Sequence, residues 1–124
     1  MESFEYDLAD PPKQKRAREL WLQHAAGFII FEDVRRYALE RIDPAHKGKT
    51  RAAIEKGIND AVYGLMMVIE GVSGALSNDK HSVTLDVIAR LTTRDGSSVK
   101  DEPIEIHLSD GDGMCMGYHY WMEG

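Results

Sequence analysis

The sequence predicts an α+β fold. Apolar residues recur at helical steps as far as Ser77, and from Val83 onward they alternate with polar ones. Helices followed by antiparallel strands are typical of α+β proteins, whereas parallel α/β folds alternate the two. We therefore expect two N-terminal helices, or one kinked helix, then a long central helix and a three-stranded antiparallel β-meander packed on it. Residues 1–124 should form a single domain.

The central helix is predicted over residues 50–77, the longest segment with a helical period. Steps of four and three place its apolar residues on one face: Ile54, Ile58, Val62, Leu65, Ile69, Val72 and Leu76. Gly57, Gly64 and Gly71 recur every seven residues beside that face. Because each helical glycine costs roughly 1 kcal/mol relative to alanine, this stripe predicts close backbone approach along one side.

The N-terminal part is predicted from its start and stop signals. Residues 1–9 read as a tail or an edge strand, and the helical pattern begins after Asp10-Pro11-Pro12. Gly27 marks a kink or a break, and the pattern ends at Asp43-Pro44 because the residue before proline is pushed out of the helical region. Thr50 is the expected cap of the central helix.

Three strands are expected in the last third of the chain. Period-two alternation covers residues 83–91, and a polar connection follows at 94–102. The second strand is predicted at 104–109, the turn at 110–113 and the third strand at 114–122.

Pairing across that turn assigns the faces of the sheet. One face should pack on the central helix through Ile104, Ile106, Leu108, Cys115, Gly117, His119 and Trp121. The opposite face mixes aromatic and ionisable groups, which is the composition of a contact surface. Its predicted partner-binding residues are Arg90, His107, Met116, Tyr118 and Tyr120. An odd loop length would exchange the two faces.

Composition and charge narrow the function classes. The net charge of -6 argues against a general nucleic-acid binder, since phosphate contacts need clustered Lys and Arg. A single cysteine excludes an internal disulfide and fits a reducing compartment. No targeting signal is visible at the start, and the longest apolar run, Leu65 to Ile69, is far short of the ~20 residues of a membrane span. These features predict a cytoplasmic protein without a cofactor.

The stretch from Glu105 to His119 concentrates ionisable groups and supports an enzymatic alternative. Its metal-binding form would use His107, Asp110, Asp112 and His119, and its acid–base form Glu70, His107 and His119. The strand pairing places His107 and His119 on opposite faces, and the Asp-Gly pairs at 110–113 fit a turn better than a calcium loop. Cys115 is interpreted as a buried thiol in preference to a nucleophile.

The function favoured by these observations is protein binding through the open sheet face. Small size, acidic balance and the absence of a catalytic motif resemble those of bacterial immunity proteins, which neutralise a toxin domain. Self-association, through the same face or through the glycine stripe, belongs to the same hypothesis. A small-ligand pocket between the central helix and the sheet is a third alternative.

Overall fold

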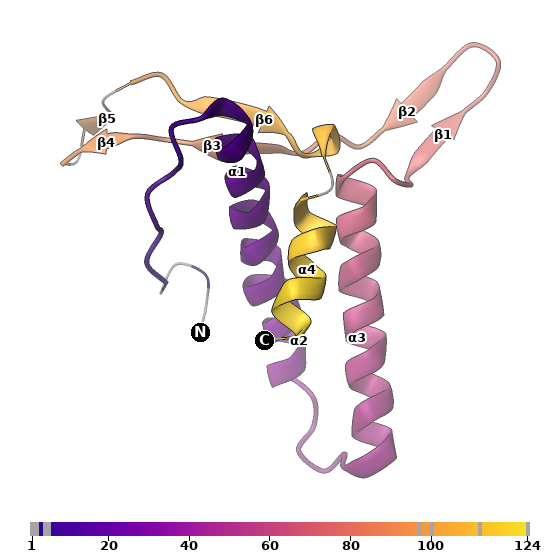
Figure 1. Ribbon diagram of the computed structural model, residues 1–124. Helices are drawn as coiled ribbons and strands as arrows, with labels where there is room; N and C mark the ends of the chain where they lie inside the picture. Colours follow the sequence, from indigo (N-terminus) through magenta and orange to yellow (C-terminus); the bar gives the residue numbers. More distant parts are fainter. Residues whose placement is uncertain (1–2, 4–5, 97, 100, 112, 124) are drawn as a thin grey trace.

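The protein is a mixed α+β structure with a long N-terminal helix, a central helix and antiparallel strands packed on the helices (Figure 1). The computed structural model describes residues 3, 6–96, 98–99, 101–111 and 113–123. Helix α1 (Lys15–Ile30), the π-helix η2 (Phe31–Arg36) and α2 (Tyr37–Glu40) follow one another without interruption. The alternative of one kinked N-terminal helix is therefore the correct one. The central helix is α3 (Gly48–Ile69).

In the described residues the strands form three separate two-stranded antiparallel sheets. Strand β1 (Ala75–Ser77) pairs with β2 (Ser82–Thr84), β3 (Ile88–Leu91) with β6 (Ile104–His107), and β4 (Arg94–Asp95) with β5 (Ser98–Val99). A short 3-10 helix, η3 (Leu108–Asp110), leads to α4 (Gly113–Glu123). The strands form a layer across one end of the helices and extend past them on both sides (Figure 1).

The irregularity in the first helix lies at η2, four residues beyond the glycine where the sequence predicted it. Gly27 stays helical and is buried. A Cβ at this position would lie 3.0 Å from the Trp121 ring and 3.2 Å from the Met114 side chain. The missing side chain at Gly27 therefore lets α4 approach α1, and the π-helical turn is a separate feature.

Helix α3 ends earlier than the apolar period suggested. Its C-cap is Glu70, and Gly71 follows with a φ of +81°. The Gly71 amide donates to the Val68 carbonyl and the Val72 amide to the Met67 carbonyl, which is the pattern of a Schellman C-cap. Because Gly71 and Gly74 take left-handed backbone angles, residues 75–77 leave the helix and form β1.

The segment predicted as the third strand is the helix α4. Its inward residues follow a helical period: Met114 and Tyr118 are buried, and Trp121 packs partly buried against the core. Helix α4 packs chiefly on α1 and also on α3. The core lies between these three helices and β3, and consists of Leu22, Phe31, Val62, Met66, Ile69, Ala89, Leu108, Met114 and Tyr118.

Two buried side chains from other helices cap the start of α4. Gln23 of α1 accepts a hydrogen bond from the Gly113 amide through Oε1 at 3.2 Å. Glu70 accepts one from the Cys115 amide through Oε1 at 2.7 Å. A carboxylate at a helix N-terminus is favoured by the helix dipole, so the acidic residue at the end of α3 has a structural role.

The β3–β6 pair keeps the predicted alternation of inner and outer residues, but its strands are shorter than predicted: residues 83–91 are divided between β2 and β3, and the strand predicted at 104–109 ends at His107. Ala89 pairs with Ile106 and faces the core, whereas Arg90 pairs with Glu105 on the outer face. The glycine stripe behaves differently from the prediction. No described atom lies within 4 Å of a Cβ built at Gly57 or Gly64, so neither position serves close approach inside the chain.

Candidate protein-binding site

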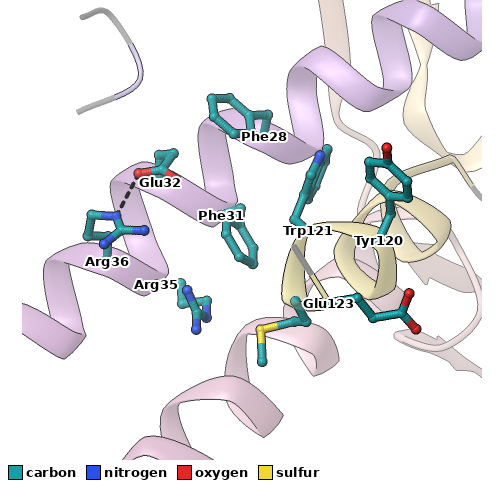
Figure 2. A pocket seen from close by; sticks show the side chains of 9 residues that line it. Phe28, Phe31, Glu32, Arg35, Arg36, Tyr120, Trp121 and Glu123 are labelled. Atoms are coloured by element: carbon teal, nitrogen blue, oxygen red, sulfur yellow. Dashed lines mark hydrogen bonds and ion pairs between the residues drawn. The ribbon is translucent and has the colours of Figure 1, made fainter. Parts of the chain in front are cut away.

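A pocket of about 680 Å³ lies between the π-helical segment and the end of α4 (Figure 2). Phe28, Phe31, Glu32, Arg35 and Arg36 line it from the N-terminal helix. The other wall is formed by residues 120–123 of α4. A π-helix makes one extra residue fit into a turn, and such bulges are frequent at functional sites. Here it carries both arginines to the pocket.

Aromatic rings form the apolar part of the pocket. The centroid of the Trp121 ring lies 5.6 Å from that of Phe28 and 5.5 Å from that of Phe31. Figure 2 shows the three side chains together at the pocket. Tyr120 stands at the rim with 76% of its surface exposed. Because its neighbour Trp121 is anchored between two phenylalanines, the tyrosine is presented from a rigid base.

The charged groups of the pocket are mostly paired within the chain. Arg36 Nε lies 2.8 Å from Glu32 Oε2, and this hydrogen bond raises the pKa of Arg36. Arg35 donates through Nε to Asn59 Oδ1 at 2.7 Å, and its guanidinium lies 4.5 Å from the centre of the Phe31 ring. Burial lowers the pKa of Arg35 from its ordinary value. Internal pairing fixes both arginine heads, which favours a preorganised contact surface.

Three of the five predicted partner-binding residues lie on α4 instead of a strand. Met116 and Tyr120 are exposed, at 54% and 76%, whereas Tyr118 is 6% exposed and points into the core. The Tyr118 hydroxyl donates to the Asn59 carbonyl at 3.1 Å, and burial raises the pKa of its phenol. Strand geometry would have kept Tyr118 and Tyr120 together, but a helix turns residues two apart to nearly opposite faces.

The remaining two, Arg90 and His107, lie on the outer face of the β3–β6 sheet. Arg90 bonds to Glu105 Oε2, with Nη2 at 3.0 Å. His107 Nδ1 lies 2.6 Å from Asp86 Oδ2. All four side chains are about half exposed, so these pairs are solvent-screened and contribute little to stability.

The three residues of the acid–base alternative do not form one cluster, because His107 lies apart on the outer face of the β3–β6 sheet, whereas Glu70 and His119 both interact with Tyr63. Glu70 caps α4, His107 lies on β6, and His119 Nε2 is 3.3 Å from the Tyr63 hydroxyl. Burial, followed by the Cys115 side chain and the Glu70 charge, raises the pKa of Tyr63. None of these side chains lines the pocket of Figure 2.

The metal-binding alternative involves a residue that lies outside the described part of the chain, Asp112. Among the residues that the structure describes, no three His, Cys, Asp or Glu side chains converge as metal ligands. His107, Asp110 and His119 therefore do not form a ligand cluster there. In the same described residues, no helix combines the length and apolar character needed to span a bilayer.

Sequence reasoning missed the N-terminal half of the pocket. Phe28, Phe31, Arg35 and Arg36 are not among the predicted site residues, although Glu32 and Arg36 have the spacing of an ion pair on one helix face. Comparison with models of protein families, with curated proteins and with solved structures gives no match. A function can therefore be proposed only from the geometry of this chain.

Proposed function

We propose that this protein is a binding module that receives a side chain of another protein in the pocket between η2 and α4. The observation that carries the proposal is Tyr120, which is 76% exposed on a helix whose next residue is locked into the aromatic core. Tyr, Trp and Arg are the residues that most often dominate the energetics of protein interfaces. All three types line this one pocket.

The lining also indicates the kind of partner. Arg35 and Arg36 balance Glu32 and Glu123 in formal charge, so the pocket offers no net charge to a charged anchor. Its apolar walls instead favour an aromatic or aliphatic side chain of the partner. The net charge of -6 on the whole chain favours a basic surface around that anchor through long-range steering. Neutralisation of a toxin domain, as by bacterial immunity proteins, is one form that this binding can take.

The test is a capture of partners from native lysate with the wild type, Tyr120→Ala and Tyr37→Ala. Tyr37 is also an exposed tyrosine, at 54%, but it lies outside the pocket, so it controls for loss of a surface ring. We expect a stoichiometric partner that wild type and Tyr37→Ala retain. With that purified partner, Tyr120→Ala should raise the dissociation constant by roughly 30-fold or more, the usual range for a hot-spot residue. Equal binding by all three proteins would refute the proposal.

A further inference from the structure

The β1–β2 hairpin, residues 75–84, is an arm that extends away from the helices (Figure 1). Among the described elements its two strands pack chiefly on each other. Leu76 and Val83 are register partners and therefore share one face of the arm, with exposures of 78% and 64%. A two-stranded hairpin with an exposed apolar face is at best marginally stable in water, so a partner that buries this face would stabilise the arm.

The tip of the arm is a hydrogen-bonded turn. The Asn78 side chain accepts hydrogen bonds from the amides of Lys80 and His81, at 2.9 and 2.8 Å, and its own amide donates to the His81 carbonyl. This turn fixes the register of the two strands. The apolar face is thus presented in a defined geometry, which suits a specific contact.

A second apolar surface of the same chain lies at the base of the arm. It is a groove of about 700 Å³ between α1 and β3, with Ala25, Ile29, Val87 and Ile88 in its lining. Ile29 and Ile88 are half exposed, at 51% and 50%. Val87 and Ile88 lie within four residues of the end of the arm at Thr84, so the arm and the groove meet at this point.

The chain as a whole exposes more surface than a compact monomer of its mass, which is enough for a contact of the size that a dimer needs. The accessible surface is 9101 Å² for a mass of 14.0 kDa. A compact monomer of this mass exposes about 6,700 Å², which leaves an excess of ~2,400 Å². Obligate homodimers bury about 1,000–2,500 Å² per chain, and even half of the excess is above the ~800 Å² per partner of a standard interface.

We infer that the partner on this surface is a second copy of the chain, with the arm of each copy lying in the groove of the other. The face that Leu76 and Val83 share on the arm is aliphatic, and so is the part of the groove formed by Ile29, Val87 and Ile88, which is the composition of obligate homodimer interfaces; Tyr6, Trp21 and Arg90 line the rest of the groove. A two-fold axis near Val87 and Ile88 makes both contacts at once, because arm and groove adjoin there. The Tyr120 pocket shares Phe28 with the groove but is otherwise lined by other residues, so each copy keeps the Tyr120 side of its binding site.

Light scattering coupled to gel filtration tests the assembly. The wild type should elute with twice the chain mass of 14.0 kDa. Leu76→Asp in the arm and Ile29→Glu in the groove should each raise the dimer dissociation constant by roughly a hundredfold or more, because each contact would bury a charge without a partner. Val99→Asp is the matched control: Val99 is an apolar residue with 58% exposure at the opposite end of the strand layer, and its variant should stay dimeric.

Mixing the two deficient variants tests the exchange itself. In a heterodimer of Leu76→Asp with Ile29→Glu, one contact carries both substitutions and the other carries none. A tagged copy of one variant should therefore retain the other, although each alone is monomeric. Circular dichroism of each variant checks that the exposed substitutions leave the fold intact.

Three results would overturn the inference. A monomeric wild type at every concentration would exclude self-association and leave the Tyr120 proposal standing, since the lysate capture tests that separately. A dimer that survives Leu76→Asp would place the interface elsewhere, for example on the glycine stripe of α3. A dimer lost with Leu76→Asp but kept with Ile29→Glu would show arm-to-arm pairing instead of exchange.

Discussion

Tyr118 and Tyr120 offer a direct test of α4, because they are the same residue type two positions apart. In the helix Tyr118 is 6% exposed and Tyr120 is 76% exposed. A tyrosine side chain can bury about 200 Å², and burial contributes about 25 cal/mol per Å². The product is about 5 kcal/mol, and because alanine keeps part of the burial, truncating the buried tyrosine to alanine should lower the free energy of unfolding by roughly 4 kcal/mol. The exposed tyrosine retains only a small contact, so Tyr120→Ala should cost at most about 1 kcal/mol.

The assay is urea denaturation followed by far-ultraviolet circular dichroism. With a slope of about 2 kcal/mol per molar urea, Tyr118→Ala should move the midpoint down by roughly 2 M and Tyr120→Ala by about 0.5 M or less. Tyr118→Phe keeps the ring and loses only the hydroxyl bond to the Asn59 carbonyl. It should cost about 1 kcal/mol.

Equal losses for the two alanine variants would refute the helical placement. In a strand, residues two apart point to the same face and would share one environment. If Tyr120→Ala lowered the free energy of unfolding strongly and Tyr118→Ala only slightly, α4 would have to pack on α1 through the opposite face. Either result would also remove the basis for the Tyr120 pocket.

Two further predictions follow from contacts described above. Gly27→Ala places a Cβ 3.0 Å from the Trp121 ring and should lower the free energy of unfolding by about 1–3 kcal/mol. Gly64→Ala meets no described atom within 4 Å and should raise the free energy of unfolding by about 0.5–1 kcal/mol. Thermal melts of the two variants and the wild type measure both changes. Burial raises the pKa of Tyr63 and of Tyr118, so the fold favours neutral phenols. The stability that the two neutral phenols contribute is fully present below the unfolded-chain pKa of about 10 and is lost as the pH rises above it. The urea midpoint of the wild type should therefore fall above pH ~10. The midpoint of Tyr118→Phe should fall less steeply, because this variant has one such phenol fewer. The same slope in wild type and variant would contradict the assignment for Tyr118.

The N-terminal helix, most of α3 and the alternation in the β3–β6 pair could be predicted because their apolar periods are unambiguous. Ala89 and Ile106 face inward and Arg90 and Glu105 outward, as two-residue alternation requires. The end of α3 could not be predicted in this way. The apolar period continues to Leu76, but the left-handed glycines at 71 and 74 stop the helix, so backbone conformation overrides side-chain pattern there.

The final segment was misassigned because its residues fit either period. Met116, Tyr118 and Tyr120 alternate as in a strand, and aromatic residues favour strands. Met114, Tyr118 and Trp121 fit a helix equally well, and packing on α1 decides between the two. The described residues of this short segment carry no local capping signal. Its capping side chains come from α1 and from the end of α3, and local sequence does not show such distant partners.

The sequence predicted Tyr120 as a residue of the exposed contact surface, but it did not predict the pocket beside it. Its other wall depends on the π-helical turn, which brings Arg35 and Arg36 beside α4. One extra residue in a helical turn leaves no pattern in local propensity, because its stability comes from tertiary contacts. The Arg35 bond to Asn59 of α3 is one such contact, formed across 24 positions of sequence.

The capping of α4 has a consequence for how the molecule opens. A helix of 11 residues is marginal by itself, and the amides of Gly113 and Cys115 are satisfied by side chains 90 and 45 positions away. Helix α4 therefore cannot persist once α1 and α3 separate, and the three helices should exchange their amide hydrogens as one cooperative unit. Slow exchange at Gly113 and Cys115 would then report the integrity of the whole helical core and of the pocket built on it.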